Sequence, residues 1–202
     1  MLQKVLVFGV SYIDLCSFWL FWGTTHGYLE MLTEPGFCTP MSDLTHFDSS
    51  GKSRMVDVGE KSVTRRMARA SALVTMKAET LDLIKSGEIG KGDVLGVSRV
   101  AGIMATKRTS DLIPLCHPIP IDGVTVEFEF PDNHRIQVMA TVCTSGKTGV
   151  EMEALTCVGV VGLTIYDMCK SVDREMAVTD VRLEEKSGGK SGHFQRASQP
   201  DS

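Results

Sequence analysis

The sequence predicts an α+β sandwich in which helices cover one face of a mostly antiparallel sheet. Residues 125–130 and 136–142 alternate between apolar and polar side chains, and the turn Pro131–His134 joins them, as in a β-hairpin with one solvent-facing side. Residues 150–172 carry apolar side chains at helical spacing. Strands and helices interleave, but the clearest strands are antiparallel, which favours this class over a doubly wound parallel sheet.

The composition is that of a globular protein. The chain has 202 residues, of which 43% are hydrophobic and 23% charged, with a formal net charge of −4. These values exclude a disordered chain, a collagen and a coiled-coil rod. The negative charge predicts no nucleic-acid partner, because a field that gathers nucleic acid needs an excess of positive charge.

The first forty residues differ from the rest. They hold most of the aromatic side chains and contain neither Ala nor Arg. We expect an extension over 1–40, one domain over 41–196 and a mobile tail over 197–202. A translation start at Met41, with 1–40 an upstream misread, is one interpretation. A targeting segment over 5–22, weakened by the charge of Asp14, and a structured N-terminal element are the others.

The remaining elements follow in chain order. Residues 54–58 alternate as a short strand or an extended arm, and a strand over 70–76 follows the charged stretch 65–69. Residues 77–86 form a helix that ends at Gly87, with Leu81 and Ile84 buried.

Asp93 is placed to cap the next helix, which runs from Val94 toward Lys107. Its expected buried stripe consists of Val97, Val100, Ala101 and Met104. In the long helix the expected stripe consists of Val150, Ala154, Val158, Val161, Ile165 and Met168. Residues 177–183 form the last strand. None of 41–202 is expected to cross a membrane.

The cysteines show no Cys-x-x-Cys spacing. Reduced, mostly buried thiols in the cytoplasm are therefore the simplest interpretation.

Two polar clusters lie in loops. Lys91 stands in a glycine-framed loop, either as an ordinary surface lysine or as a side chain held near a ligand. Leu115, Cys116 and His117 lie between prolines, which keep the segment extended. Neighbouring side chains then point to opposite sides, so Cys116 and His117 do not form a catalytic dyad; one is expected to enter the core and the other to be presented.

Two further clusters lie at the ends of the long helix. Glu151 and Glu153 stand in its first turn, where helix-dipole effects alone favour carboxylates. Asp167 and Lys170 have the i,i+3 spacing of an ordinary surface pair, or of a proton-transfer pair if they lie in a cleft. Glu153 and Asp167 are separated by roughly 21 Å of helix, so one small substrate cannot touch both on the same helix. If both clusters are catalytic, either a bulky substrate spans them or two subunits share each site, and the second alternative favours a symmetric oligomer.

Two other motifs are weak. The sequences Gly-Lys-Thr at 146–148 and Gly-Lys-Ser at 189–191 lack the earlier glycine of a P-loop, although their lysines can still hold phosphate. A metal site could be built from His117, Glu151, Glu153 and Asp167, but these residues lack the spacing typical of metal ligands, so no metal is predicted. If they did bind a metal, the alternative function would be that of a metal-dependent phosphohydrolase acting on a nucleotide.

Taken together, the motifs resemble the molybdenum cofactor biosynthesis protein C family, the cyclic pyranopterin monophosphate synthases. The matching stretches span about 44 to 195 in order, at residues 44–47, 55–58, 91–94, 107–109, 111–118, 148–156, 164–170 and 186–192. Residues 1–40 lie outside the resemblance.

The resemblance implies a ferredoxin-like fold and a homohexamer, a trimer of dimers with active sites between subunits. It implies a cytoplasmic lyase that converts a 3′,8-cyclised dihydro-GTP to cyclic pyranopterin monophosphate and pyrophosphate, without metal, flavin or nicotinamide.

The resemblance also implies roles for individual residues. Asp167 and Lys170 are the central catalytic pair, with Lys91 as a further acid–base group. The implied substrate-binding residues are Leu115, Cys116, His117, Glu151, Met152 and Glu153. The implied phosphate contacts are Lys147, Lys186 and Lys190.

Overall fold

The structure, a computed structural model, describes residues 52–197. The proposed boundary at residues 40 and 41, the first stretch of the resemblance at 44–47 and all but the first residue of the tail 197–202 lie outside this range. The elements are β1 (Thr64–Thr75), α1 (Ala78–Ser86), α2 (Val94–Thr106), α3 (Thr109–Leu112), β2 (Gly123–Glu129), β3 (Arg135–Gly146), α4 (Glu151–Cys169), β4 (Ala177–Ser187) and β5 (Phe194–Gln195).

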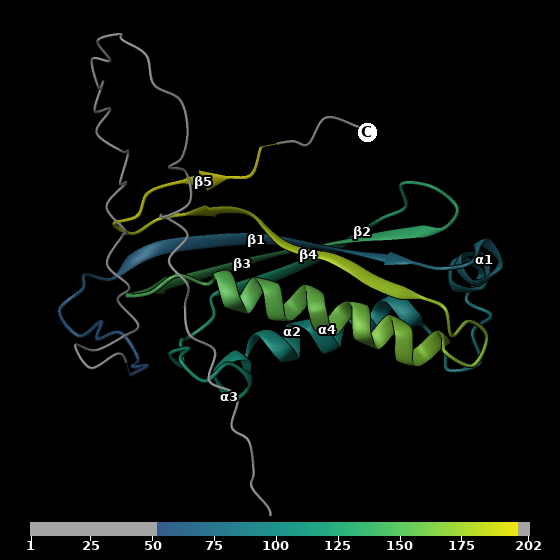
Figure 1. The fold of residues 1–202 in the computed structure, drawn as a ribbon, viewed down its shortest axis with the longest axis horizontal. Helices are drawn as coiled ribbons and strands as arrows, with labels where there is room; N and C mark the ends of the chain where they lie inside the picture. Colours follow the sequence, from purple (N-terminus) through teal and green to yellow (C-terminus); the bar gives the residue numbers. More distant parts are fainter. Residues whose placement is uncertain (1–51, 198–202) are drawn as a thin grey trace, which may run out of the picture. The chain divides into compact units, whose positions relative to one another are not determined.

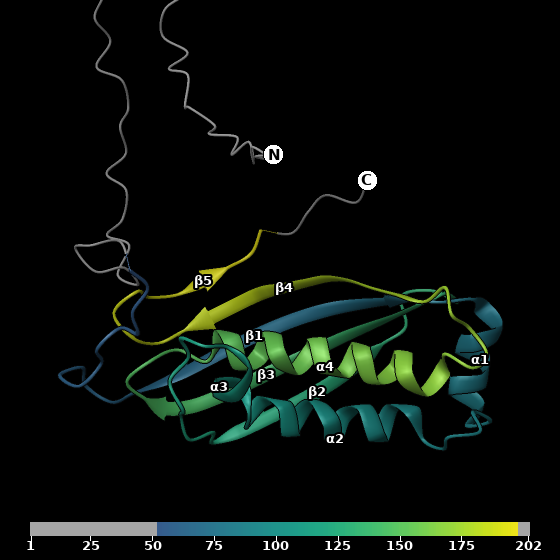
Figure 2. The same cartoon turned by 60° about the horizontal axis from the view of Figure 1, so that its bottom comes forward.

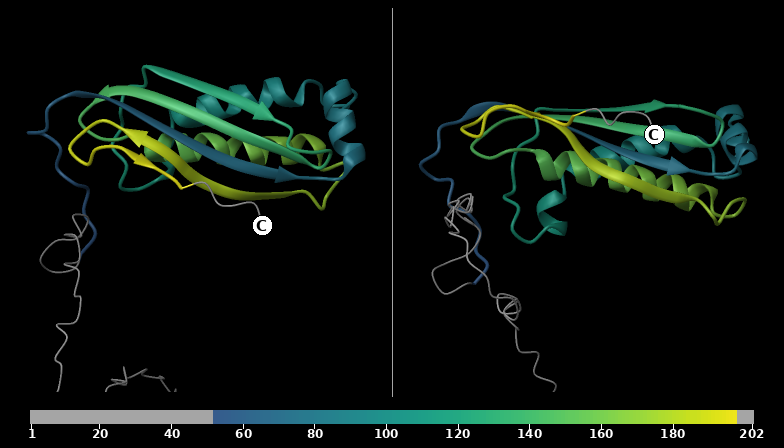
Figure 3. Two further views of the ribbon diagram at one scale, coloured as in Figure 1. Left: turned by 90° about the horizontal axis from the view of Figure 1, so that it is seen from above. Right: turned by 45° about the horizontal axis from the view of Figure 1, so that its top comes forward.

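The five strands form one antiparallel sheet in the order β2-β3-β1-β4-β5. Helices α2 and α4 lie side by side on one face of this sheet, with α1 at one end of α4 and α3 at the other (Figures 1 and 2). The views in Figure 3 show the opposite face of the sheet without a helical layer. The first four strands and the crossing helices have the ferredoxin-like βαββαβ arrangement. The predicted fold class is confirmed.

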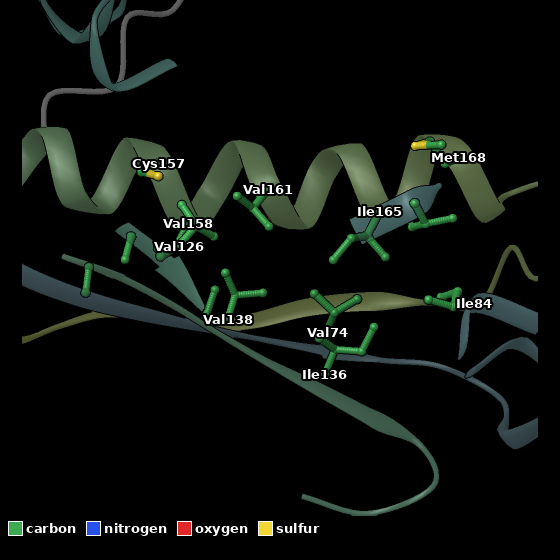
Figure 4. Close-up of a cluster of buried hydrophobic side chains, with 14 of the residues drawn as sticks. Val74, Ile84, Val126, Ile136, Val138, Cys157, Val158, Val161, Ile165 and Met168 are labelled. Carbon is green, nitrogen blue, oxygen red and sulfur yellow. The ribbon is translucent and has the colours of Figure 1, made fainter. Parts of the chain in front are cut away.

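The core lies between α4 and the sheet. One face of α4 points its side chains at those of β1 and β3, and Figure 4 shows this layer with Val158, Val161 and Ile165 above Val74, Ile136 and Val138. Every residue of the predicted α4 stripe is buried. The helix begins at Glu151 and ends at Cys169, within the predicted range.

Local sequence signals explain several boundaries. Gly87 ends α1 in the left-handed region at φ 74°, and its N–H donates to the backbone oxygens of Leu83 and Ile84. The carboxylate of Asp93 accepts from the N–H of Gly96 at 2.8 Å and caps α2 as predicted. The predicted hairpin is β2 paired with β3.

Two strand predictions need correction, and the structure decides between the two alternatives given for residues 54–58. β1 begins at Thr64, so the charged stretch 65–69 belongs to the strand, with Ala68 buried and the flanking Arg69 on the other face. β4 extends to Ser187, four residues beyond the predicted end, and the glycine-rich loop after it turns back into β5. Residues 54–58 form no strand, so the extended-arm interpretation fits.

The predicted buried stripe of α2 is wrong. Val97, Val100 and Met104 are about half exposed, at 47%, 57% and 55%. The buried side of α2 consists instead of Val94, Ser98, Gly102, Ala105 and Thr106. The reason is close packing: a Cβ on Gly102 would lie 2.5 Å from Val161 and 3.0 Å from Cys157 of α4, so only a face of small residues fits there.

Within residues 52–197, α4 is the one helix whose length and hydropathy would suit a membrane span. Half of that window is buried inside the fold, as expected for the central helix of a packed domain.

Candidate active site

Three charged side chains meet at the C-terminal end of α4. The carboxylate of Asp167 lies between two ammonium groups, with Lys170 Nζ 2.7 Å from Oδ1 and Lys91 Nζ 3.0 Å from Oδ2. Lys91 also donates to the backbone oxygen of Asp167 at 2.8 Å. The structure therefore brings together the three residues for which the resemblance implies acid–base roles, although Lys91 is 76 positions away in sequence.

The fold positions Lys91 through α1. No side chain of its own caps the N-terminus of α1, but the carboxylate of Asp173, beyond the end of α4, accepts from the N–H of Lys77 at 2.9 Å and from the hydroxyl of Thr80 at 3.3 Å. The start of α1 is thus tied to the segment that follows Lys170. The loop after Gly87 then carries Lys91 to Asp167.

The charges of this cluster reinforce one another. Hydrogen bonds from Lys170 and then Lys91 hold the pKa of Asp167 below its ordinary value. The hydrogen bond to Asp167 raises the pKa of Lys170. All three side chains are about half exposed in the single chain. These three side chains of the single chain therefore do not lie in a cleft of the kind that lowers the pKa of a lysine by desolvation.

A second cluster lies at the N-terminal end of α4. All six residues with an implied substrate-binding role line one cavity of about 290 Å³, together with Val56, Val58, Lys61, Thr148 and Gly149. Cys116 and His117 are both half-buried and both line it, so the expectation that one of them enters the core is wrong. The extended arm at 54–58 closes part of this cavity.

Glu153 is the unusual group of this cavity. Glu153 is 4% exposed. Desolvation raises the pKa of its carboxyl group to about 7; a hydrogen bond from its own backbone N–H acts in the opposite direction, and the nearby charge of Glu151 adds to the rise. Burial and the charge of Glu153 also raise the pKa of the Cys116 thiol. The cavity therefore holds a carboxyl group poised to exchange protons near neutral pH and a thiol kept protonated.

A third hollow of about 680 Å³ adjoins the second and shares Lys61, Thr148, Gly149 and Glu151 with it. Cationic side chains line it: Lys61, Arg66, Lys147 and Lys190. Lys186 lies at its border, 3.4 Å from Glu151 and 2.7 Å from the hydroxyl of Ser191. This lining suits an anion with several phosphates.

Among the residues of this hollow, sequence reasoning missed Lys61, Thr64 and Arg66 and their neighbours Glu60 and Ser62. Arg66 donates to the backbone oxygens of Gly146 and Lys147 at 3.0 and 3.1 Å, which fixes its guanidinium beside the hollow. The hydroxyl of Thr64 is buried without a protein partner. Thr64 and Arg66 lie on the same face of β1, but residues 64–70 do not alternate between polar and apolar side chains, so the sequence carries no clear signal for them.

The two halves of the predicted site lie at opposite ends of α4. Asp167, Lys91 and Lys170 are at its C-terminal end, and the two cavities are at its N-terminal end. This separation also removes the metal set considered above, because Asp167 is far from His117, Glu151 and Glu153. No group of three His, Cys, Asp or Glu side chains within residues 52–197 is placed to hold a metal ion.

Comparison with known proteins gives a single family. Cyclic pyranopterin monophosphate synthase 3 of Mycobacterium tuberculosis is 60% identical over 153 residues, which cover 76% of this chain and 86% of that protein. The cyclic pyranopterin monophosphate synthases of Desulfitobacterium hafniense and Heliobacterium modesticaldum are each 57% identical, over 76% and 77% of this chain and 94% and 99% of theirs. The MoaC family model matches residues 55–189. These residues contain every one of the side chains described above except Lys190 and Ser191, and the chain belongs to the MoaC family.

Proposed function

We propose that the chain is a cyclic pyranopterin monophosphate synthase of molybdenum cofactor biosynthesis, a lyase. Its substrate is (8S)-3′,8-cyclo-7,8-dihydroguanosine 5′-triphosphate, and its products are cyclic pyranopterin monophosphate and pyrophosphate. The observation that carries the proposal is the contact of Lys91 and Lys170 with the carboxylate of Asp167. The names of the relatives support the same activity.

The rearrangement requires repeated proton transfers, because one ring of the guanine opens and a pyrazine ring closes. Ammonium groups held by a carboxylate donate protons, and Glu153, whose pKa is about 7, serves as acid or base at neutral pH. No electrons are gained or lost, so this chemistry takes no redox cofactor.

Release of pyrophosphate requires positive charge beside the triphosphate. The third hollow offers Lys147 and Lys190 from the sequence prediction, with Lys186 at its border and Arg66 and Lys61 in addition. A guanidinium and several ammonium groups stabilise the charge that develops on the leaving group.

Each active site is completed by two copies of the chain. Asp167 and Glu153 lie 14 residues apart on one helix, roughly 21 Å at the helical rise, which exceeds the reach of one pterin ring system. We propose a homohexamer, a trimer of dimers, in which the C-terminal end of α4 from one copy joins the cavities of another.

The proposed location is the cytoplasm.

The direct test is incubation with the cyclised precursor, following pyrophosphate and the fluorescence of the oxidised pterin. Release of both products is expected from the wild-type chain, and none from Asp167→Asn or Lys170→Ala. Activity that disappears on exhaustive chelation would instead favour the metal-dependent phosphohydrolase, whose product from a nucleotide is inorganic phosphate.

The sharing of sites has its own test. Lys170→Ala and Glu153→Gln chains, each inactive alone, are co-expressed with different tags and the mixed oligomer is purified. If two copies share each site, a site is intact when its Lys170 comes from the Glu153→Gln chain and its Glu153 comes from the Lys170→Ala chain. In a random mixture of the two chains this holds for about a quarter of all sites. Recovery of activity near that fraction is expected, and a mixture that stays inactive contradicts site sharing.

A further inference from the structure

The glycine-rich loop between β4 and β5 lies beside the third hollow. This loop, residues 188–193, places Lys190 and Ser191 in the lining of the hollow. Lys186, near the end of β4, lies on the side of the hollow, 2.7 Å from the hydroxyl of Ser191 and 3.4 Å from the carboxylate of Glu151. The position of the loop therefore decides where two of the ammonium groups meet an anion.

The loop has much conformational freedom for a segment that carries a binding group. Gly188, Gly189 and Gly192 have φ values of 91°, 74° and 70°, in the left-handed region that favours glycine. A Cβ on Gly188 would overlap the backbone oxygen of Arg65, so the loop lies against β1 only with a glycine at this position. Glycine loses more backbone freedom on ordering than any other residue, so the loop needs contacts at its ends to hold one conformation.

The C-terminal end of the loop is held by a short strand. β5 has two residues, which pair with Glu185 and Lys186 of β4 at the edge of the sheet (Figure 1). Arg196 follows and donates its backbone N–H to the oxygen of Glu184 and its Nε–H to the oxygen of Leu183, both at 2.8 Å. Because this ladder is so short, one further contact between β4 and the loop adds a large share of what holds the loop in place.

His193 supplies such a contact. Its Nε2 lies 2.9 Å from Oε1 of Glu185, which joins the last residue of the loop to β4. Gln195 is the direct partner of Glu185, so His193 is the diagonal neighbour of Glu185 across the two strands. Opposite charges in cross-strand pairs stabilise the pairing of the strands.

The charge of the imidazole sets the strength of this contact. Histidine ordinarily changes its charge between pH 5 and pH 8, and an imidazolium forms a charge-assisted hydrogen bond with a carboxylate. The other charged groups beside Glu185 in the sheet are Arg69, its partner on β1, and Arg196 at the end of β5. Arg69 donates to the sulfur of Met139 at 3.1 Å, and Arg196 donates to a backbone oxygen of β4. With both guanidinium groups directed elsewhere, the carboxylate of Glu185 is available to His193.

We propose that His193 is a positioning residue for the glycine-rich loop. Its contact with Glu185 fixes the loop at the third hollow and so keeps Lys190 in place for the phosphates, and the contact strengthens as the imidazole takes up a proton. The proposal deepens the proposed function and rests on it for the identity of the anion. Because the loop is ordered before any bond changes, its effect falls on binding of the anion and not on the proton transfers at Asp167.

The first test measures the binding of inorganic tripolyphosphate to the full chain by calorimetry at pH 6 and pH 8. We expect His193→Gln, which cannot become charged, to raise the dissociation constant at pH 6 by about two- to fivefold, as for loss of one cross-strand ion pair. At pH 8 a histidine is ordinarily neutral, so the ratio of the two constants should approach one. His134→Gln is the matched control, because His134 is an exposed histidine in the turn before β3, at the opposite end of β3 from the hollow. This control should match wild type at both pH values.

The second test separates positioning from a simple effect of charge. His193→Gln removes a positive charge near the hollow and Glu185→Gln removes a negative one, so a long-range field would change the affinity for tripolyphosphate in opposite directions. Loss of a positioning contact weakens binding in both variants, and the double variant should bind no more weakly than either single one. His193→Lys keeps a positive charge at both pH values, so it should bind as wild type does at pH 6 and more tightly than wild type at pH 8.

The third test is the kinetics of the cyclised precursor at pH 6. His193→Gln should raise KM by the same factor as the dissociation constant and leave kcat unchanged, because the contact stabilises the bound substrate and the transition state equally.

Tighter binding by Glu185→Gln, unchanged binding by His193→Gln at pH 6 or an equal change in His134→Gln would overturn the proposal. A wild-type chain that does not bind tripolyphosphate, or a loss in His193→Gln that falls on kcat, would overturn it too. Wild-type turnover without the expected pattern of affinities rejects the positioning role and leaves the proposed function standing. The expected affinities in a chain that does not convert the precursor support the positioning role and reject the proposed function.

Discussion

Lys91 donates to Asp167 twice, to the carboxylate at 3.0 Å and to the backbone oxygen at 2.8 Å. The backbone oxygens in the last turn of a helix lack partners within the helix, so an ammonium group there is doubly favoured. The second contact fixes Lys91 at the end of α4 even when the carboxylate side chain moves. The geometry of this pair therefore depends on the helix end as well as on the side chain.

Asp167→Asn tests the role of this carboxylate. The amide keeps the shape but removes the charge that raises the pKa of Lys170. We expect turnover of the cyclised precursor to fall by about 10²-fold or more, as for loss of a positioned acid–base partner. The midpoint of urea unfolding should stay close to that of wild type, because the three side chains are about half exposed. Steady-state kinetics and urea titration measure the two effects.

Lys85→Ala is the control for loss of an exposed lysine. Lys85 lies in the last turn of α1, over the ring of Phe130, away from Asp167. Its replacement should leave turnover unchanged. Equal losses of activity in Asp167→Asn and Lys85→Ala would contradict a specific role for Asp167.

Much of the fold follows from local patterns in the sequence. The stripe of α4 is apolar at every predicted position, and the glycine that ends α1 and the aspartate that caps α2 act through single hydrogen-bonded turns. The inner face of α2 could not be predicted in this way. Ser98 and Thr106 are buried there because their hydroxyls donate to backbone oxygens four residues earlier, which hydropathy does not register.

The site was only partly predictable for a similar reason. The spacing of Asp167 and Lys170 places them one turn apart on any helix. Lys91 meets them because the fold brings the loop after α1 to the end of α4, where Asp173 also holds the start of α1, and spacing carries no information about such a contact. The cationic hollow gathers residues from β1, the loop after β3 and the glycine-rich loop, so only the fold brings Arg66 to Lys190.

Glu153 makes stability depend on pH in a defined direction. Its pKa is raised to about 7 in the folded chain, above the ordinary 4.5. The folded state therefore binds the proton more tightly, and the stability that the neutral form contributes is fully present below about pH 4.5 and lost as pH rises through 7. Relative to wild type, Glu153→Gln should gain stability between pH 5 and pH 8, by at most about 3 kcal/mol. Urea unfolding of both proteins at the two pH values measures this.

Glu127→Gln removes a carboxylate from the exposed side of β2 and serves as its control. The difference between Glu127→Gln and wild type should be similar at both pH values. If Glu153→Gln also showed no pH-dependent difference, the raised pKa of Glu153 would be refuted.

Asp173→Ala tests the anchoring of α1. Asp173 is 2% exposed. Burial alone would raise the pKa of its carboxyl group, but this group accepts hydrogen bonds from the N–H groups of Lys77 and Glu175 and from the hydroxyl of Thr80. The net result is a lowered pKa. Its contribution is therefore present at neutral pH and lost as pH falls through the lowered value. We expect the variant to lose about 1–2 kcal/mol at pH 7, as for loss of a helix cap, and less at low pH. Glu175→Ala, which removes only an exposed ion pair with Lys77, should change stability by less than about 1 kcal/mol. Equal effects of the two substitutions would contradict the anchoring role.

Gly102→Ala tests the close contact between α2 and α4. The added Cβ would lie 2.5 Å from Val161 Cγ2, 3.0 Å from Cys157 Sγ and 3.2 Å from the backbone oxygen of Cys157, so the two helices would have to separate. Overpacking of this kind costs about 1–3 kcal/mol, and the better helix propensity of Ala returns up to about 1 kcal/mol of it. We expect a net loss of stability in urea unfolding. Gly123→Ala on β2, where nothing lies within 4 Å of the added carbon, should show no such loss. A Gly102→Ala chain as stable as wild type would mean that α2 shifts freely on α4, and the exposed side of α2 would then no longer be fixed by this packing.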